Sequence, residues 1–330
     1  MVEVWRTPLT RRFVADFCSC GFWVAVLFWT TVVVVPFFLA FTSQSFWMRT
    51  GTYYEYPEVE FTYKMLMHAG GYDGADVPQV ITYATPPELH PIAATKGGLR
   101  IPSLSTYIED ANRDEVAEVI HVEAEVPLRQ GETLHSINAL FMFQLKLKDR
   151  AKLVMENAVY VDYSPPLPGS SLYYDCDLRL MQRNPLSVRG GYPNVPLYQD
   201  DTLLSNSTYS PGTSADLTMS KLLRRYRDRN ISTSIDHVYS AWTPSAGSRT
   251  ASTTQEPFRL HLAVRVPQQG ILYRPGLSEM LKFAWIQYLA LAFIVYVLGT
   301  YSADFVYNFQ VVETTSRLDT QYYGPKIHRF

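Results

Sequence analysis

Two long apolar stretches divide the chain into a short tail, a large polar region and a second tail. Residues 283–301 contain no charged side chain, and a helix of about 19 residues is long enough to cross the hydrocarbon core of a bilayer. Residues 17–41 are interrupted only by small polar residues, and a stretch of about 25 residues exceeds the roughly 7–15 of a signal-peptide core. The pattern therefore predicts two transmembrane helices, the first an uncleaved signal anchor, in preference to buried helices of a soluble core.

The second predicted span carries features of a docking surface. Trp285 and Tyr288 lie near its first end, as amphipathic rings do at membrane interfaces. Gln287 is its main polar interruption, and a polar side chain within a bilayer can hydrogen-bond a partner helix. Arg274 and Lys282 lie in the polar collar before the span. We therefore predict that Arg274, Lys282, Trp285 and Gln287 contact a partner.

Residues 42–282, between the two spans, show the alternation of β-strands. Apolar and polar residues alternate with a period of two in segments 59–67, 120–126, 141–147 and 260–266. Such alternation gives a strand one buried and one solvated face, and Pro/Gly turns separate the segments. About 240 residues can bury a core of their own. We therefore predict a mainly-β domain with an antiparallel, sandwich-like fold and one or two short helices.

One helix is predicted within this region, over residues 215–229. Its leucines and Tyr226 fall on one side, and its basic residues lie largely elsewhere. The preferred interpretation is a helix that covers one side of the sandwich and keeps a solvated basic face. The alternative is a basic surface that contacts acidic lipid or an acidic partner.

Composition narrows the class of protein. The 330 residues carry a formal net charge of −2, which gives no nucleic-acid or acidic-substrate signal, and a mean hydropathy of −0.08 indicates few membrane helices. The chain has three cysteines, which excludes a disulfide-stapled domain, and Cys176 is predicted to be a small buried hydrophobe. Cys18 and Cys20, beside the first span, are palmitoylation candidates, with unmodified thiols as the alternative.

Two N-glycosylation sequons set the predicted orientation. Their acceptors, Asn206 and Asn230, both lie between the spans, and neither tail has a sequon. Basic residues beside the spans are nearly balanced and give little information. We therefore predict that residues 42–282 are extracellular or lumenal and that the tails over residues 1–16 and 302–330 are cytoplasmic.

An acidic loop before one predicted strand has the spacing of a calcium site. Oxygen-bearing side chains occupy positions 1, 3, 5 and 9 of the loop: Asp110, Asn112, Asp114 and Glu118. This spacing directs oxygen ligands around one hard cation. Position 6 is Glu115, where a sharp turn prefers glycine, and position 12 is a histidine in place of an acidic residue. An acidic surface loop is therefore the alternative to a Ca²⁺ site.

The sequence contains no catalytic signature. The seven histidines lack zinc-ligand spacing, and the chain has no H-E-x-x-H, G-x-S-x-G, Walker or G-x-G-x-x-G motif. The two spans contain no charged residue that would mark an ion path. We expect a protein that is not an enzyme, with no certain cofactor, no small-molecule substrate and no nucleic-acid partner.

Several sequence blocks, in the same order along nearly the whole chain, resemble the transmembrane protein 231 family, a component of the ciliary transition zone. The longest block contains YRPG at residues 273–276 and KFAW at residues 282–285. The others include SFW (45–47), LRIP (99–102), LVM (153–155), PGS (168–170), DLRL (177–180), RNIST (229–233) and QVV (310–312). The chain departs from the family in an insert over residues 243–255 and at Glu115.

This resemblance implies a non-enzymatic structural component of the transition-zone membrane, at the base of a cilium or flagellum. Family members work with tectonic, meckelin and the C2-like proteins of the Meckel complex, in a diffusion barrier for membrane proteins that also supports ciliogenesis. Two other classes stay open from the residues: a chaperone-like β-subunit of a lipid flippase or other transporter, and a two-span ligand-gated channel subunit. Both normally have disulfide-bonded ectodomains, which a single cysteine between the spans disfavours.

Overall fold

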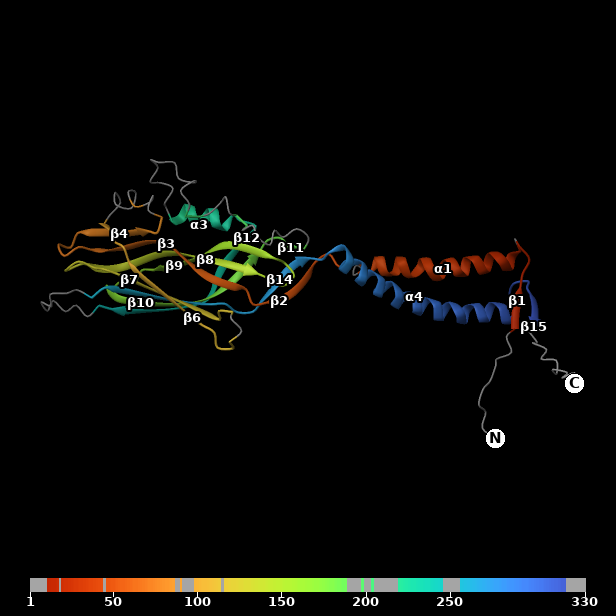
Figure 1. Cartoon of the computed structure of the whole chain (residues 1–330). Helices are drawn as coiled ribbons and strands as arrows, with labels where there is room; N and C mark the ends of the chain where they lie inside the picture. Colours follow the sequence, from red (N-terminus) through yellow and green to blue (C-terminus); the bar gives the residue numbers. More distant parts are fainter. Residues whose placement is uncertain are drawn as a thin grey trace, which may run out of the picture. The chain divides into compact units, whose positions relative to one another are not determined.

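The chain forms two compact units, shown with their elements in Figure 1. One consists of Met1–Arg49 and Gly276–Phe330, and we call its two long helices the helix pair. The other is Thr50–Pro275, which we call the β-domain. The computed structural model describes residues 11–17, 19–43, 46–86, 90, 98–113, 116–188, 197–198, 203–204, 219–245 and 256–318.

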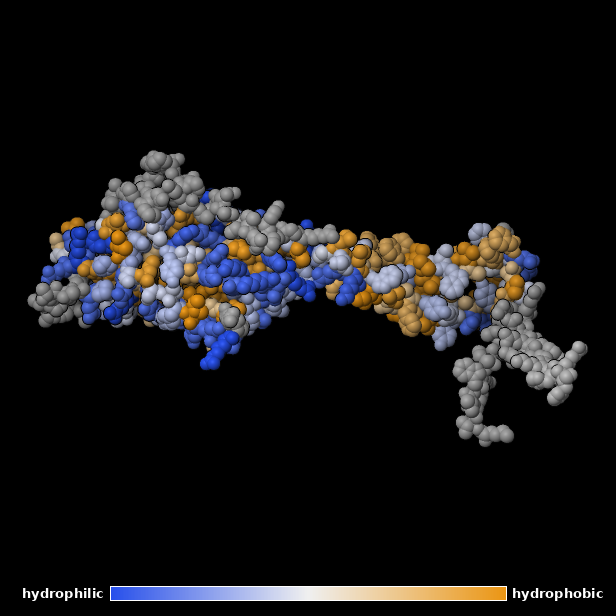
Figure 2. Space-filling model, in the orientation of Figure 1, coloured by the Kyte–Doolittle hydropathy of each residue, from blue (hydrophilic) through white to orange (hydrophobic). Residues whose placement is uncertain are grey.

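The helix pair consists of α1 (Cys20–Thr42) and α4 (Leu277–Asn308). Ser19 caps α1, because its hydroxyl accepts a hydrogen bond from the Phe22 N–H at 3.3 Å. Both helices are long and apolar enough to cross a membrane, and large apolar side chains are exposed along them (Figure 2). The prediction of two apolar helices that flank a mainly-β domain is therefore confirmed.

Helix α4 extends beyond residues 283–301 at both ends. It begins directly after Gly276, whose extended backbone forms the N-cap, and it continues past Asp304 to Asn308. Charged and polar residues end an apolar stretch without ending a helix, because their backbone still makes helical hydrogen bonds. The ends of a helix do not mark the surfaces of a bilayer, so the predicted membrane boundaries at residues 17–41 and 283–301 stay predictions.

The two helices approach each other closely at Gly299. A Cβ atom added at this position would lie 2.7 Å from the Phe28 ring and 3.3 Å from Val32 Cγ2. Elsewhere in the pair, Ala40 and Ala284 belong to one buried cluster with Phe46. Small residues let apolar helices pack in a bilayer, where close van der Waals contact replaces the hydrophobic effect.

Gly299→Leu is expected to destabilise the helix pair by about 1–3 kcal/mol, because the new side chain overfills the contact with Phe28. Ala290→Leu is the matched control, since Ala290 is an exposed position on the same helix. Unfolding of both variants in mixed detergent micelles measures the difference. Equal stability of the two variants would show that Gly299 does not set the packing of α1 and α4.

A short antiparallel pairing joins segments from opposite ends of the chain. Strand β1 (Arg11–Val14) pairs with β15 (Thr315–Leu318). The Thr315 hydroxyl also donates to the Val14 carbonyl at 2.9 Å. Local sequence pattern does not predict this pairing, because each strand is only four residues long and its partner is distant in sequence.

The β-domain contains a sheet of ten described strands that folds into two halves. The halves share one pairing, Gly169 with Leu134, and one apolar core with residues from both. One half comprises β5 (Gly98–Leu99), β4 (Pro78–Ala84), β3 (Glu58–Tyr72), β8 (Thr133–Leu147) and β9 (Leu153–Tyr163). The other comprises β12 (Ile231–Pro244), β10 (Gly169–Gln182), β13 (Phe258–Arg265), β7 (Val119–Val126) and β6 (Ser103–Glu109).

The predicted antiparallel pairing holds for most strand pairs but not for all. Strand β10 pairs in parallel with β13, and β4 pairs in parallel with β5. The chain between β10 and β13 includes α3 (Met219–Arg227) and β12. A connection of this length can return the chain to the same end of the sheet, which parallel pairing requires and a hairpin cannot supply. Alternation within a strand carries no information about the direction of its neighbour.

The alternation itself predicted the core face correctly in β7, where Ile120, Val122 and Ala124 are buried. In β8 it was wrong for Met142, which was expected on the solvated face and is fully buried. Helix α3 lies over the β3–β8–β9 part of the sheet (Figure 1). On the second face of β8, Met142 belongs to a buried cluster with Leu222 of that helix. A strand that is covered on both faces loses the contrast between its two sets of side chains.

A small three-stranded sheet comprises β2 (Gly51–Glu55), β14 (Gln269–Arg274) and β11 (Leu186–Ser187). Tyr273 of β14 is buried, packs edge-on against Tyr53 and accepts a hydrogen bond from the Arg150 guanidinium. The polar collar that precedes the second span in the sequence therefore begins inside the β-domain, which ends at Pro275. Strand β14 pairs with β2, and its alternate residues, Tyr273 among them, face the core.

Candidate functional site

An apolar groove lies on the helix pair. Its volume is about 920 Å³, within the range of lipid- and ligand-sized pockets. Among the described residues that line it, Lys282 is the only cation, and two tryptophans supply amphipathic rings. The lining residues are Val33, Val34, Phe37, Phe46, Trp47, Ser278, Leu281, Lys282, Ala284, Trp285 and Tyr288.

The structure brings two of the four predicted docking residues together. Lys282 and Trp285 both line the groove, and Trp285 is 63% exposed. Gln287 lies half-buried on α4 and is not part of the lining. Arg274 is exposed at the end of β14 and belongs to the β-domain. Contact of these four residues with a partner stays a prediction.

The acidic loop is described in part. The Asp110 side chain accepts a hydrogen bond from the Arg113 N–H at 2.7 Å, Asn112 is exposed and Glu118 is half-buried. Asp114 lies outside the described residues. Among the residues that are described, no group of three or more His, Cys, Asp or Glu side chains is arranged to hold a metal. The four-ligand Ca²⁺ site stays a prediction.

The predicted modification sites are exposed where the structure describes them. Asn230 is exposed between α3 and β12, and Cys20 is an exposed free thiol at the start of α1. Asn206 and Cys18 lie outside the described residues. Cys176 is fully buried, as predicted. Burial raises the pKa of its thiol to about 12, so the thiol stays protonated and unreactive at neutral pH.

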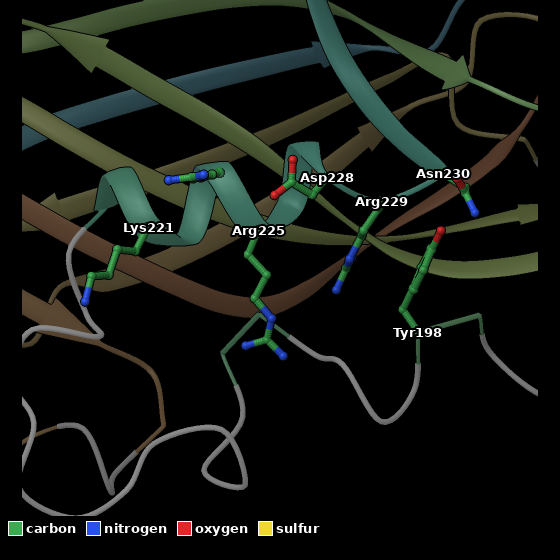
Figure 3. Close-up of a pocket in the computed structure, with 7 residues that line it drawn as sticks. Tyr198, Lys221, Arg225, Asp228, Arg229 and Asn230 are labelled. Carbon is green, nitrogen blue, oxygen red and sulfur yellow. The ribbon is translucent and has the colours of Figure 1, made fainter.

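A second cavity, the basic pocket, lies at α3 on the β-domain (Figure 3). Its volume is about 480 Å³. It is lined by Tyr198, Lys221, Arg224, Arg225, Asp228, Arg229 and Asn230. The basic run of residues 221–229 was visible in the sequence, but its meeting with Tyr198 was not, because Tyr198 comes from a separate segment.

Arg229 is the buried member of this pocket, with an exposed fraction of 5%. Its guanidinium lies 4.6 Å from the Tyr198 ring centre and 5.4 Å from that of Tyr226, which places the cation against two π faces. Its Nη1 donates to the Glu156 carbonyl at 3.3 Å. Burial lowers the pKa of Arg229, and the charge of Arg225 acts in the same direction.

Tyr226 fixes α3 on the sheet beneath the pocket. Its hydroxyl oxygen accepts hydrogen bonds from the Thr233 N–H at 2.8 Å and from the Ala158 N–H at 3.2 Å. It also lies 2.7 Å from the Thr233 hydroxyl. One buried side chain therefore joins α3 to β9 and β12. These hydrogen bonds hold the helix that carries Lys221, Arg224 and Arg225 of the basic pocket.

Two long apolar helices that flank one mainly-β domain define a membrane protein with two candidate membrane-spanning helices. The family model described as Transmembrane protein 231 matches residues 1–316. The chain therefore belongs to the transmembrane protein 231 family.

Proteins named Transmembrane protein 231 are similar to the chain over nearly their full length. The protein from Xenopus tropicalis is 29% identical over 316 residues, which cover 96% of each chain. That from Homo sapiens is 29% identical, with 95% of this chain and 94% of the relative covered. That from Gallus gallus is 31% identical, with 95% and 93% covered.

Proposed function

We propose that this protein is a non-enzymatic structural component of the ciliary or flagellar transition-zone membrane. It contributes to the diffusion barrier that controls the protein composition of the ciliary membrane, and thereby to ciliogenesis. The observation that carries the proposal is family membership over residues 1–316, which includes both apolar helices and the whole β-domain. The mechanism is assembly: surfaces of the helix pair and of the β-domain bind neighbouring proteins.

The groove on the helix pair is the proposed membrane-level contact. Its apolar lining fits a partner helix or lipid, and the ammonium of the lining residue Lys282 fits a polar group at the membrane interface. Gln287 lies one turn from Ala284 on α4 and can add an interhelical hydrogen bond worth about 0.6–2 kcal/mol. The proposed partners are tectonic, meckelin and the C2-like proteins of the Meckel complex.

Imaging tests the location. A tagged copy expressed from its own locus is expected at the ciliary base, coincident with a transition-zone marker. Deletion of the gene is expected to let plasma-membrane proteins enter the cilium. A uniform plasma-membrane or endomembrane signal with none at the ciliary base would contradict the proposal, and would favour an accessory subunit of a transporter.

The groove is tested with two tryptophan variants. Trp285→Ala removes a lining side chain, and Trp29→Ala removes a similarly exposed side chain (57%) that does not line the groove. We expect Trp285→Ala to reduce the signal at the ciliary base several-fold and Trp29→Ala to leave it unchanged. Equal signals would show that docking at the transition zone does not use this groove.

The proposed orientation places both tails in the cytoplasm and the β-domain outside it. Asn230 is exposed and heads a sequon, so an extracytoplasmic β-domain should carry a glycan there. Asn230→Gln is expected to increase the electrophoretic mobility of the protein and to remove the part of its endoglycosidase sensitivity that this site supplies. Full-length protein that is insensitive to endoglycosidase even with both sequons intact would argue against this orientation.

A further inference from the structure

The basic pocket gathers positive charge in a chain that is slightly acidic overall. Among the residues that the structure describes, four cations and one carboxylate line it, whereas the formal net charge of the whole chain is −2. Lys221, Arg224 and Arg225 are spaced i, i+3 and i+4, so they share one face of α3 and repel one another. An anion that binds on this face is attracted by all three cations.

The side chains are directed for binding an anion. Figure 3 shows Lys221, Arg225 and Arg229 extending to the same side of the helix and the turn that follows it, with Tyr198 beside Arg229. Arg229 is held by the two tyrosine rings and by the Glu156 carbonyl. A guanidinium held in place loses little entropy when a carboxylate binds its planar fork. Burial of Arg229 also raises the benefit of a nearby negative charge.

A membrane surface does not fit this pocket. A helix that lies in a bilayer interface buries its apolar face among lipids. In α3 that face is already used, because Leu222 and Tyr226 are 3% and 6% exposed and pack on the sheet. The helix therefore presents charge to solvent without the apolar side chains that would anchor it in lipid.

We propose that the basic pocket binds an acidic segment of a partner polypeptide, whose Asp or Glu carboxylates pair with the four lining cations, Lys221, Arg224, Arg225 and Arg229. Asp228 and the Asn230 amide also line the pocket, and both can accept hydrogen bonds. A polypeptide brings backbone N–H donors for these acceptors, whereas a polysulfated glycan brings mainly further acceptors and negative charge. Binding of an acidic segment is a property additional to the proposed function. If no such binding is found, the proposed location at the transition zone is unaffected.

The test uses the full chain in nanodiscs of neutral phosphatidylcholine and a fluorescent octaglutamate peptide, with octaglutamine as the neutral probe. All proteins carry Ser232→Ala, which destroys the N-glycosylation sequon, so that Asn230 lines the pocket without a glycan. We expect fluorescence anisotropy to show binding of octaglutamate only. The affinity should fall steeply as salt is raised from about 0.1 M to about 1 M, where the Debye length drops from roughly 10 to 3 Å.

Two charge-reversal variants distinguish binding of octaglutamate at the pocket from non-specific electrostatic attraction to the protein. Arg224→Glu is expected to weaken octaglutamate binding about tenfold. Lys152→Glu is the matched control, because Lys152 is exposed outside the pocket and its reversal changes the net charge equally. It is expected to change the affinity less than about twofold. Hydrogen exchange of the β8 amides confirms that both variants are folded.

Several outcomes would overturn the proposal. Octaglutamate binding that survives Arg224→Glu, or that falls equally with Lys152→Glu, would show that the pocket is not the site. Binding of a heparin oligosaccharide that Arg224→Glu removes, without octaglutamate binding, would assign the pocket to sulfated glycans. Binding only to nanodiscs that contain phosphatidylserine would assign the cations to a lipid surface.

Discussion

Glu132→Gln is expected to lower the free energy of unfolding of the β-domain by about 3–5 kcal/mol, because it leaves the Arg100 cation without its buried counter-charge. The Glu132 carboxylate is 1% exposed, and its Oε1 lies 3.0 Å from Arg100 Nη2. Its other oxygen accepts the Arg129 N–H at 2.7 Å. The pair ties the chain after β5 to the turn before β8, so its loss opens one edge of the sandwich.

Glu125→Gln is the matched control for this prediction. Glu125 and Arg259 also form an ion pair, at 3.2 Å, but their side chains are 48% and 69% exposed. Solvent screens such a pair, and its loss is expected to cost less than about 1 kcal/mol. Hydrogen exchange of the β8 amides measures both changes on the same strand. Similar losses of unfolding free energy in the two variants would show that the buried Arg100–Glu132 pair stabilises the β-domain no more than an exposed pair does.

The same carboxylate makes the β-domain sensitive to acid. Burial raises the pKa of Glu132, but the Arg129 N–H, Gln79 and the Arg100 charge together lower it further than burial raises it. The folded pKa therefore lies below the ordinary value of 4.5. The stabilisation is present above the ordinary pKa and is lost as the pH falls through the folded value. Glu132→Gln should remove this part of the acid sensitivity.

Tyr226→Phe is expected to destabilise the β-domain by about 2–4 kcal/mol, because each buried amide that loses its acceptor costs roughly 1–3 kcal/mol. The hydroxyl that is removed accepts from two backbone N–H groups, those of Ala158 and Thr233. The phenyl ring keeps the packing of Tyr226, which is 6% exposed. The effect therefore isolates the hydrogen bonds that join α3 to β9 and β12.

Hydrogen exchange again provides the measurement, with the Ala158 and Thr233 amides expected to show the largest acceleration. Tyr239→Phe is the control, since Tyr239 is 70% exposed on β12. This substitution should change the free energy of unfolding of the β-domain by less than about 0.5 kcal/mol. The Tyr226 variant should also weaken octaglutamate binding, because α3 carries the pocket cations. Unchanged protection of both amides would contradict the role given to the hydroxyl.

The sequence predicted the features of this protein that depend on local pattern. Length and apolar character identified α1 and α4, since a membrane span needs no information beyond its own residues. Alternation identified the core face of β7, where Glu123 and Glu125 on the opposite face are exposed. Blocks of residues along the chain identified the family, and the family match covers residues 1–316.

Only the tertiary structure decided which distant residues meet. The coverage of Met142 depends on α3, about 80 positions further along the chain, and the parallel pairing of β10 with β13 depends on the path between them. The basic pocket exists because Tyr198 meets Arg229, and the helix contact exists because Gly299 meets Phe28. Periodicity reports whether a residue faces a core, but the identity of the neighbour is set by how the whole chain packs.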